Sequence, residues 1–216
     1  MTITEITEFS KKKNKISFEN GEFLVVYKGM TDTEATELSE ETYASLFKEM
    51  LRYAKRRAMN LLIKSDRSVA EIRSKLSEDG HNPEIIAEVL RFLDSYGYLD
   101  DRRTAEHLVK SLREQKSIRE IRSRLKMRGI SDEDAEYAIN VAYSEQPASM
   151  NDAGSEGDLS EHEISVMVSK LKRSGMTPEM IHVLDRKDRD KLAAKFYRKG
   201  FKAENIRKVL DLSEFE

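Results

Sequence analysis

The 216-residue chain contains no cysteine, only three prolines and few aromatic residues, at 7%. Without cysteine the chain has no disulfide framework, no thiolate zinc site and no cysteine nucleophile. No apolar run approaches the length of a membrane span, and the N-terminus lacks the basic-then-apolar order of a secretion signal. Together these absences predict a soluble, cytoplasmic protein that does not contact a membrane. A charged fraction of 36% also favours a helix-rich chain.

Motifs for catalysis or metal binding are missing as well. No P-loop, dinucleotide-binding glycine motif or nucleophile elbow occurs. The acidic pair Asp100-Asp101 has the chemistry to hold a divalent cation, but a helix-capping role explains it more simply. The chain has four scattered histidines with no metal-ligand spacing, namely His81, His107, His162 and His182. We therefore predict a protein that is not an enzyme and that has no cofactor and no metal.

What the sequence does contain is one motif that occurs three times, over Ser68–Gly80, Ser117–Gly129 and Asp188–Gly200. Each copy has the same length and the same apolar positions. The aligned apolar residues are Ile72, Ile121 and Leu192, followed by Leu76, Leu125 and Phe196. A repeated supersecondary unit buries its apolar face against its neighbours and forms an array with no central cleft. The repeat therefore favours a surface that follows a partner over an enzyme pocket.

Each copy carries helix boundary signals. Ser68 with Glu71, and Ser117 with Glu120, fit the capping box at a helix N-terminus. The glycine that ends each copy stands where a helix C-terminus accepts the left-handed conformation. A second amphipathic pattern follows each glycine, and another precedes each motif. The preceding stretches are Ala54–Ile63, Thr104–Leu112 and Glu163–Arg173. Three helices per repeat are therefore predicted.

The third copy departs from the other two, because Lys191 replaces the capping glutamate and Arg189 replaces an apolar residue. Its N-terminal cap is therefore predicted to be weakened. The preceding segment 144–160 has no basic residue and no apolar period, which predicts an acidic flexible linker. How the third repeat is oriented after this linker stays open.

The N-terminal segment predicts a small sheet instead of helix. Lys15–Lys28 has Asn20-Gly21 at its centre, flanked by strand-forming residues, which predicts a β-hairpin with a type I′ turn. Thr2–Phe9 alternates less clearly and is a candidate third strand. A helix is expected to begin after Ser39.

The predicted fold is therefore mainly α, with tandem three-helix repeats in an elongated array and a small N-terminal β-hairpin. The predicted parts are 1–50 for the hairpin and the start of a helix, 51–100 for the first repeat, 101–143 for the second, 144–160 for the linker and 161–216 for the third.

The net charge of −2 hides a segregation of charge. Lys110–Arg128 holds eight basic residues against two glutamates, whereas residues 129–163 hold no basic residue against ten acidic ones. Arg119, Arg122 and Lys126 are spaced to share one helix face. For any single residue a solvated face is the simpler interpretation, but for the cluster a binding surface is an equal alternative. The candidate partner-binding residues are Arg113, Lys116, Arg119, Arg122, Arg124, Lys126, Arg128 and Arg73.

Several of these motifs resemble one family. Arg67-Ser68 with Glu71-Ile72, and GYLDD at 97–101 followed by Ala105, are similar to the RecX family of recombinase regulators. The resemblance covers the chain outside the acidic segment. It implies tandem three-helix units that lie in the groove of the RecA–DNA filament, without enzymatic activity. There they restrain recombinase, ATPase and coprotease activities, within DNA repair, DNA recombination and the SOS response.

Two other interpretations stay open. A three-helix unit with a basic helix also fits non-specific binding to nucleic acid, so single-stranded DNA is a second candidate partner. Sequence-specific readout is not expected, because the basic residues lack an accompanying set of Asn and Gln side chains. A scaffold for another helical partner is the third interpretation. We expect a monomer, although the sequence does not decide self-association.

Overall fold

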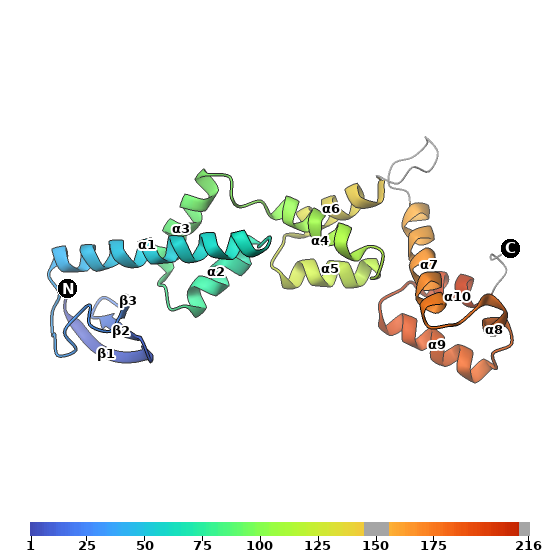
Figure 1. Ribbon diagram of the computed structural model, residues 1–216, viewed down its shortest axis with the longest axis horizontal. Helices are drawn as coiled ribbons and strands as arrows, with labels where there is room; N and C mark the ends of the chain where they lie inside the picture. The colour runs from blue at the N-terminus through green and yellow to red at the C-terminus, as the bar shows by residue number, and fades with distance from the viewer. Residues whose placement is uncertain (145–155, 212–216) are drawn as a thin grey trace. The chain divides into compact units, whose positions relative to one another are not determined.

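The computed structural model describes residues 1–144 and 156–211, which fall into two compact units, Met1–Asp100 and Asp101–Glu216 (Figure 1). The described residues form ten helices and one three-stranded sheet. The mainly α fold class and the small N-terminal sheet are thus confirmed. Each unit is built around apolar clusters of its own.

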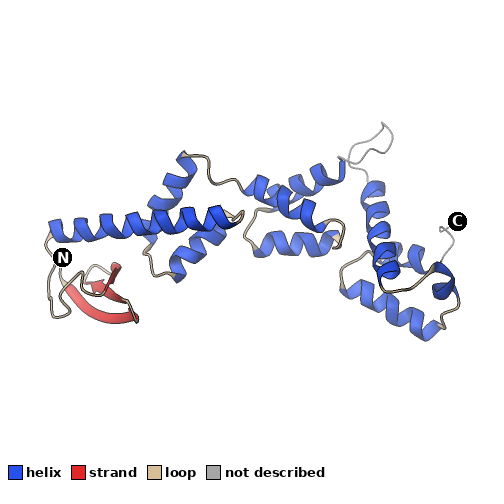
Figure 2. Cartoon of the chain, viewed as in Figure 1, coloured by secondary structure: helices blue, strands red, loops and turns tan. Residues whose placement is uncertain are grey.

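The N-terminal sheet has three antiparallel strands in the order β1 (Ile3–Ser10), β2 (Lys13–Phe18) and β3 (Phe23–Tyr27) (Figure 2). The candidate third strand therefore forms, and the predicted two-stranded hairpin is only part of the sheet. Ile16 pairs with Ile6 on one side and with Leu24 on the other. Because Ile16 and Leu24 are fully buried, one face of the sheet belongs to the core of the first unit.

The turn between β2 and β3 differs from the prediction. Gly21 N–H donates to the Phe18 carbonyl at 3.0 Å, and Phe18 N–H donates to the Glu22 carbonyl at 2.9 Å. The loop therefore has three residues instead of the two of a type I′ turn. Gly21 has φ of +82°, as three-residue hairpin loops require at their left-handed position. The Asn20 side chain accepts from Glu22 N–H at 3.0 Å, which favours this longer loop.

Helix α1 (Glu40–Lys64) is the longest in the described residues and joins the sheet to the first repeat. Ser39 caps it, as predicted, by accepting from Thr42 N–H at 3.1 Å. The expected boundary between residues 50 and 51 falls inside this helix. Met50 and Ala54 lie one turn apart and are both buried in the same cluster. The sheet and the first repeat therefore share one core.

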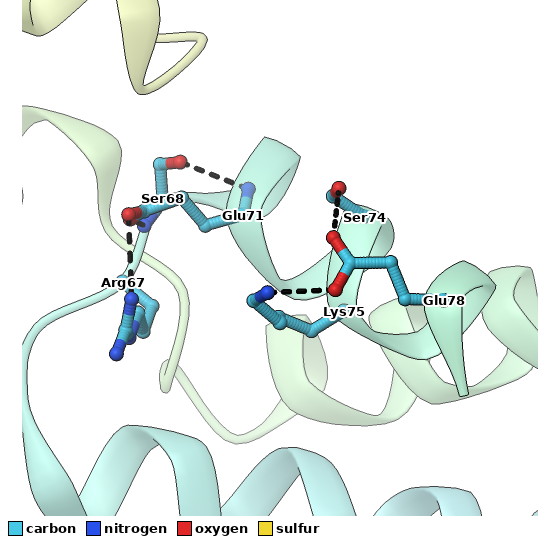
Figure 3. Close-up of polar contacts among 6 residues, drawn as sticks. All are labelled: Arg67, Ser68, Glu71, Ser74, Lys75 and Glu78. Carbon is cyan, nitrogen blue, oxygen red and sulfur yellow. Dashed lines mark hydrogen bonds and ion pairs between the residues drawn. The ribbon is translucent and has the colours of Figure 1, made fainter.

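Helices α2 (Val69–Glu78) and α3 (Pro83–Ser95) complete the first repeat. The predicted capping box of α2 is present: Glu71 N–H donates to Ser68 Oγ at 3.1 Å, and Ser68 N–H donates to the Glu71 carboxylate at 2.9 Å. Figure 3 shows this cap beside Glu78, which accepts from Ser74 and Lys75 one turn before it. Gly80 follows in the left-handed conformation, with φ of +91°.

The second repeat consists of α4 (Asp101–Leu112), α5 (Ile118–Met127) and α6 (Asp132–Ser144). The third consists of α7 (Glu156–Arg173), the short α8 (Pro178–His182), α9 (Arg186–Arg198) and α10 (Ala203–Asp211). Ile121 and Leu125 of α5 are fully buried, like Ile72 and Leu76 in the first repeat. The predicted phasing of the repeats is therefore correct for these positions.

The cap of the third motif lies one turn earlier than predicted. Asp185 is the N-cap of α9 and accepts from Asp188 N–H at 2.7 Å. The cap is therefore displaced, and the prediction of a weakened cap at Asp188 is wrong. Leu184, just before the cap, packs against the core of the third repeat and favours the earlier start. The additional helix α8 accounts for part of the longer spacing before this motif.

The predicted acidic linker 144–160 overlaps a helix at each of its ends. Ser144 ends α6, and residues 156–160 are already part of α7. Leu159 packs against the apolar cluster of the second repeat, which is a physical reason for helix at this end. Residues 145–155 lie outside the described residues.

Candidate functional site

A cleft of about 550 Å³ in the second unit is the candidate functional site. It lies where α5 of the second repeat meets α7 and α9 of the third. Five cationic side chains and one carboxylate line it, which gives a balance of +4. The lining residues are Lys116, Arg119, Glu120, Ser123, Lys170, Tyr197, Arg198, Lys199 and Gly200. This set is called the basic cleft below.

The two repeats that line the basic cleft contact each other through a hydrogen bond of Ser117. The buried Ser117 hydroxyl donates to the Lys199 carbonyl at 2.6 Å and accepts from Glu120 N–H at 3.2 Å. The hydroxyl thus caps the N-terminus of α5 and at the same time binds the C-terminal cap residue of α9. Helix ends leave N–H and carbonyl groups without intrahelical partners. The Ser117 side chain therefore supplies a hydrogen-bond partner to one such group on each of the two helices.

Gly200 permits this close approach. It has φ of +83°, and a Cβ atom placed on it would lie 3.1 Å from Ser117 Oγ and 3.1 Å from the side-chain carbons of Arg119. Such distances are shorter than about nine in ten real Cβ contacts, so a neighbouring side chain would have to shift by a few tenths of an ångström. The glycine is therefore required both by its backbone conformation and by the proximity of α5.

A buried carboxylate fixes the third repeat on the second. Glu163 of α7 is 3% exposed. Its oxygens accept from Ile118 N–H at 3.4 Å, from Lys202 N–H at 3.3 Å and from Asn205 Nδ2 at 3.0 Å. Ile118 begins α5, and Lys202 directly precedes α10. One side chain thus binds the N-termini of helices from both repeats, where the helix dipole favours a negative charge.

The electrostatics of the basic cleft favour an anion. Burial lowers the pKa of Lys170 below its ordinary value, and the charges of Lys199 and Lys116 lower it further. In the described part of the chain Arg119, Lys170, Arg198 and Lys199 form no ion pair with a carboxylate. A bound anion would relieve the mutual repulsion of these cations. Chemically the site is suited to bind phosphate or carboxylate groups.

Glu120 is the one carboxylate of the lining, and it is already engaged. Burial by itself raises its pKa, but hydrogen bonds from Lys116 and Arg124 outweigh this effect, so that the pKa lies below its ordinary value. The distances to these two nitrogens are 2.8 and 3.3 Å. Glu120 therefore holds Lys116 in place and leaves the other cations of the cleft available.

The predicted basic residues are separated by the structure. Only Lys116 and Arg119 line the cleft. Arg122 donates two hydrogen bonds to Glu136 on α6, at 2.6 and 2.8 Å, so the guanidinium of Arg122 is already paired with a carboxylate. Arg113 binds the Ala142 carbonyl at 2.6 Å.

The other candidates lie elsewhere. Arg124 pairs with Glu120, Lys126 is exposed outside the cleft, Arg128 is half-buried, and Arg73 is exposed on α2 of the first unit. Sequence reasoning missed Lys170, Tyr197, Arg198 and Lys199 as site residues. The sequence contained one indication of Arg198 and Lys199, because these residues directly precede the glycine that ends the third motif.

Within the described residues, no group of three or more His, Asp or Glu side chains is placed to hold a metal ion. None of the described helices is both long enough and apolar enough to pass through a bilayer.

Comparison with known proteins shows a likeness to one family. The model of the first three-helix domain of RecX matches residues 54–93, which are the end of α1, all of α2 and most of α3. The crystal structure of a regulatory protein RecX superposes with a TM-score of 0.58 over 97% of this chain and 98% of that one. Over these residues the chain is similar to the RecX family. The sequence resemblance is thereby confirmed.

Relatives in the RecX family match parts of the chain. The regulatory protein RecX of Clostridium acetobutylicum is 30% identical over 139 residues, which cover 61% of this chain and 64% of the relative. That of Chromohalobacter salexigens is 39% identical over 83 residues, or 38% of this chain and 55% of the relative. These matches span less than two thirds of either relative.

A second solved structure, RecX from Lactobacillus salivarius, has a TM-score of 0.56 at 20% identity and covers 76% of this chain. The structure described first shares 18% identity. At these identities the two structures support the RecX-type fold of tandem three-helix repeats.

Proposed function

We propose that this protein is a non-enzymatic regulator of the RecX type that binds the RecA recombinase filament and mostly inhibits its recombinase, ATPase and coprotease activities. The observation that carries the proposal is the basic cleft, built across two repeats of a chain that is similar to regulatory proteins named RecX.

The cleft suits a filament partner for a physical reason. A balance of +4 in one cleft attracts a surface rich in carboxylates or phosphates. A RecA filament on DNA offers both kinds of anion. Glu163 and Ser117 hold the two repeats together, so the cations are positioned before the partner arrives, which lowers the entropic cost of binding.

Direct, non-specific binding to single-stranded DNA is the second candidate. Tyr197 lines the cleft beside Arg198 and Lys199, and the tyrosine is 60% exposed. Sites for single-stranded nucleic acid usually combine cations that contact its phosphate backbone with an exposed aromatic ring on which a base can stack. Both functions are compatible with a single surface.

The test measures the DNA-dependent ATP hydrolysis of RecA with this protein added in trans. We expect the rate to fall as the protein is added, and the purified protein alone to hydrolyse no ATP. A pull-down of RecA with and without single-stranded DNA and ATP shows whether the filament is the partner. An unchanged RecA rate at saturating protein and moderate salt would show that the regulator proposal is wrong.

A further inference from the structure

The first unit holds a second cluster of cations, remote in sequence from the basic cleft. It lines a cavity of about 250 Å³ where the sheet meets α1 and the end of α2. One stripe of α1 supplies half of the lining, with residues spaced by three or four positions. The lining residues are Lys13, Tyr27, Tyr53, Arg56, Arg57, Asn60, Asp79 and His81.

Asp79 positions two of the three cations. Lys13 Nζ donates to the Asp79 carbonyl at 2.8 Å, and Arg57 Nε donates to its carboxylate at 2.7 Å. Each of these bonds uses one donor, although an ammonium group has three and a guanidinium group has five. The residue therefore holds both cations at the cavity wall with donors to spare.

Arg56 is the third cation, and no carboxylate neutralises it. Its guanidinium carbon lies 5.4 Å from the centre of the Tyr53 ring, and in the described residues it forms no ion pair. Tyr53 in turn packs edge-on against Tyr27, with ring centres 5.2 Å apart. The two packed rings thus form one side of the cavity. The exposed Arg56 guanidinium lies over this side, and no carboxylate neutralises its charge.

The net charge of the lining suits a dianion. Three cations oppose one carboxylate, which leaves a balance of +2. Burial lowers the pKa of Lys13, although the charge of Asp79 opposes this effect. His81, 7% exposed, has a pKa lowered to about 4 by burial and by Lys13, so it is neutral near pH 7. No second carboxylate lines the cavity.

We propose that this cavity binds the phosphate group of a small phosphomonoester, such as a nucleoside monophosphate or the 5′-phosphate end of a nucleic acid strand. A phosphomonoester carries a charge of about −1.5 to −2 at pH 7 and has three strong acceptor oxygens, which match the +2 balance and the spare donors. The volume suits a phosphate with an attached sugar and excludes a folded macromolecule. This proposal is independent of the function proposed above, because it uses other residues in the other unit.

The experiment records the imidazole NMR signals of His81 in the full-length protein during titration with inorganic phosphate, a nucleoside 5′-monophosphate, and oligonucleotides that end in a 5′-phosphate or a 5′-hydroxyl. We expect the phosphomonoesters to shift the His81 signals in a saturable manner. Arg56→Gln should weaken binding about tenfold, because a charge-assisted hydrogen bond is lost.

Arg52→Gln is the matched control. Arg52 also lies 5.4 Å from the Tyr53 ring, is exposed on α1, and does not line the cavity, so its loss should leave affinity unchanged. Preference for the free nucleotide, or for the 5′-phosphate strand alone, would support the proposal and identify the source of the phosphate. No saturable shift with any phosphomonoester, equal effects of Arg52→Gln and Arg56→Gln, or equal binding of the 5′-hydroxyl strand would overturn it.

Discussion

The Ser117 hydroxyl donates to the Lys199 carbonyl at 2.6 Å and so joins the start of α5 to the end of α9. The two residues are 82 positions apart in the chain, yet each belongs to the same motif of its own repeat. The second and third repeats therefore contact each other through the helix-end groups that the motif repeats. The basic cleft lies at this junction.

Ser117→Ala should destabilise the second unit by about 1–3 kcal/mol. The substitution removes the N-cap of α5 and also leaves the Lys199 carbonyl without its donor. Ser131→Ala is the matched control, because Ser131 is exposed and caps only α6, by accepting from Asp134 N–H at 3.0 Å. The control should cost about 1 kcal/mol. Urea unfolding, followed by hydrogen exchange in α5, measures the loss of stability in both variants. Equal losses would mean that the contact between the repeats adds no stability.

Gly200→Ala should be more harmful than Gly175→Ala. Both glycines have positive φ, at +83° and +77°, so both substitutions strain the backbone by about 1 kcal/mol. Only at Gly200 would the added Cβ contact neighbouring atoms, at 3.1 Å from α5, whereas Gly175 has open space. We expect an additional loss of about 1–3 kcal/mol at Gly200 from overpacking. Thermal unfolding of the two variants would detect the difference, and identical melting temperatures would contradict it.

Leu76→Ala and Leu125→Ala should have similar effects, because the two side chains occupy equivalent positions in their repeats. Both are fully buried, and truncation of a core leucine costs about 2–5 kcal/mol. The measurement is urea unfolding of each variant beside the wild type. A cost below about 1 kcal/mol at both positions belongs to surface changes and would show that neither side chain is a core residue.

The sequence predicted the parts of the fold that depend on local chemistry. Ser68 forms the expected capping box with Glu71, because the two residues act within one turn. At α5 the Ser117 hydroxyl caps the helix as expected, but the Glu120 carboxylate pairs with Lys116 and Arg124.

The cap of α9 was misplaced because two aspartates, Asp185 and Asp188, both offer local capping. The choice between them depends on the packing of Leu184 in the core of the third repeat. A local sequence pattern does not show this tertiary contact.

The candidate site was predicted only in part, for a similar reason. Lys116 and Arg119 were found because they belong to one dense basic stretch. Lys170 and Lys199 were missed because tertiary packing brings their helices to α5.

The ion pair of Arg122 was not predicted, because its partner Glu136 lies on the next helix, beyond the reach of spacing rules for a single helix. In the first repeat the equivalent residue Arg73 faces a different situation. Ala87 stands at the position of Glu136, so the same ion pair cannot form.

The stability of the first unit should fall in acid because of His81. Its pKa is about 4 in the folded protein and 6.5 without the fold, since burial and the charge of Lys13 disfavour the protonated ring, while Asp79 partly opposes them. Between these values the unfolded chain binds more protons, so stability is complete above about pH 6.5 and decreases as the pH falls toward 4. The loss is on the order of 3 kcal/mol.

The measurement for His81 is urea unfolding across this pH range for the wild type and for His81→Gln. The glutamine variant should lack this part of the pH dependence, which amounts to roughly 1.4 kcal/mol per pH unit at its steepest. Carboxylates that titrate in the same range affect both proteins, so the difference isolates the histidine. Parallel curves for the two proteins would contradict the prediction.

Charge reversal on α5 tests the basic cleft against the rest of the basic stretch. Arg119→Glu lowers the balance of the cleft from +4 to +2, whereas Lys126→Glu changes the same charge on an exposed residue of the same helix outside the cleft. Arg122 is left in place, because its reversal would break the pair with Glu136. We expect Arg119→Glu to weaken binding to the RecA filament about tenfold or more, since like-charge contacts penalise docking, and Lys126→Glu to have a small effect.

The same two variants, measured on bare single-stranded DNA, separate the two proposed functions. If the cleft contacts phosphates, wild-type affinity should fall with log salt at a slope of about −0.7 per neutralised phosphate, and Arg119→Glu should flatten that slope. A loss on bare DNA with undiminished filament binding would favour the nucleic-acid function over the filament. Equal effects of Arg119→Glu and Lys126→Glu in both assays would mean that net charge alone governs binding, because only a positioned site distinguishes two cations on the same helix.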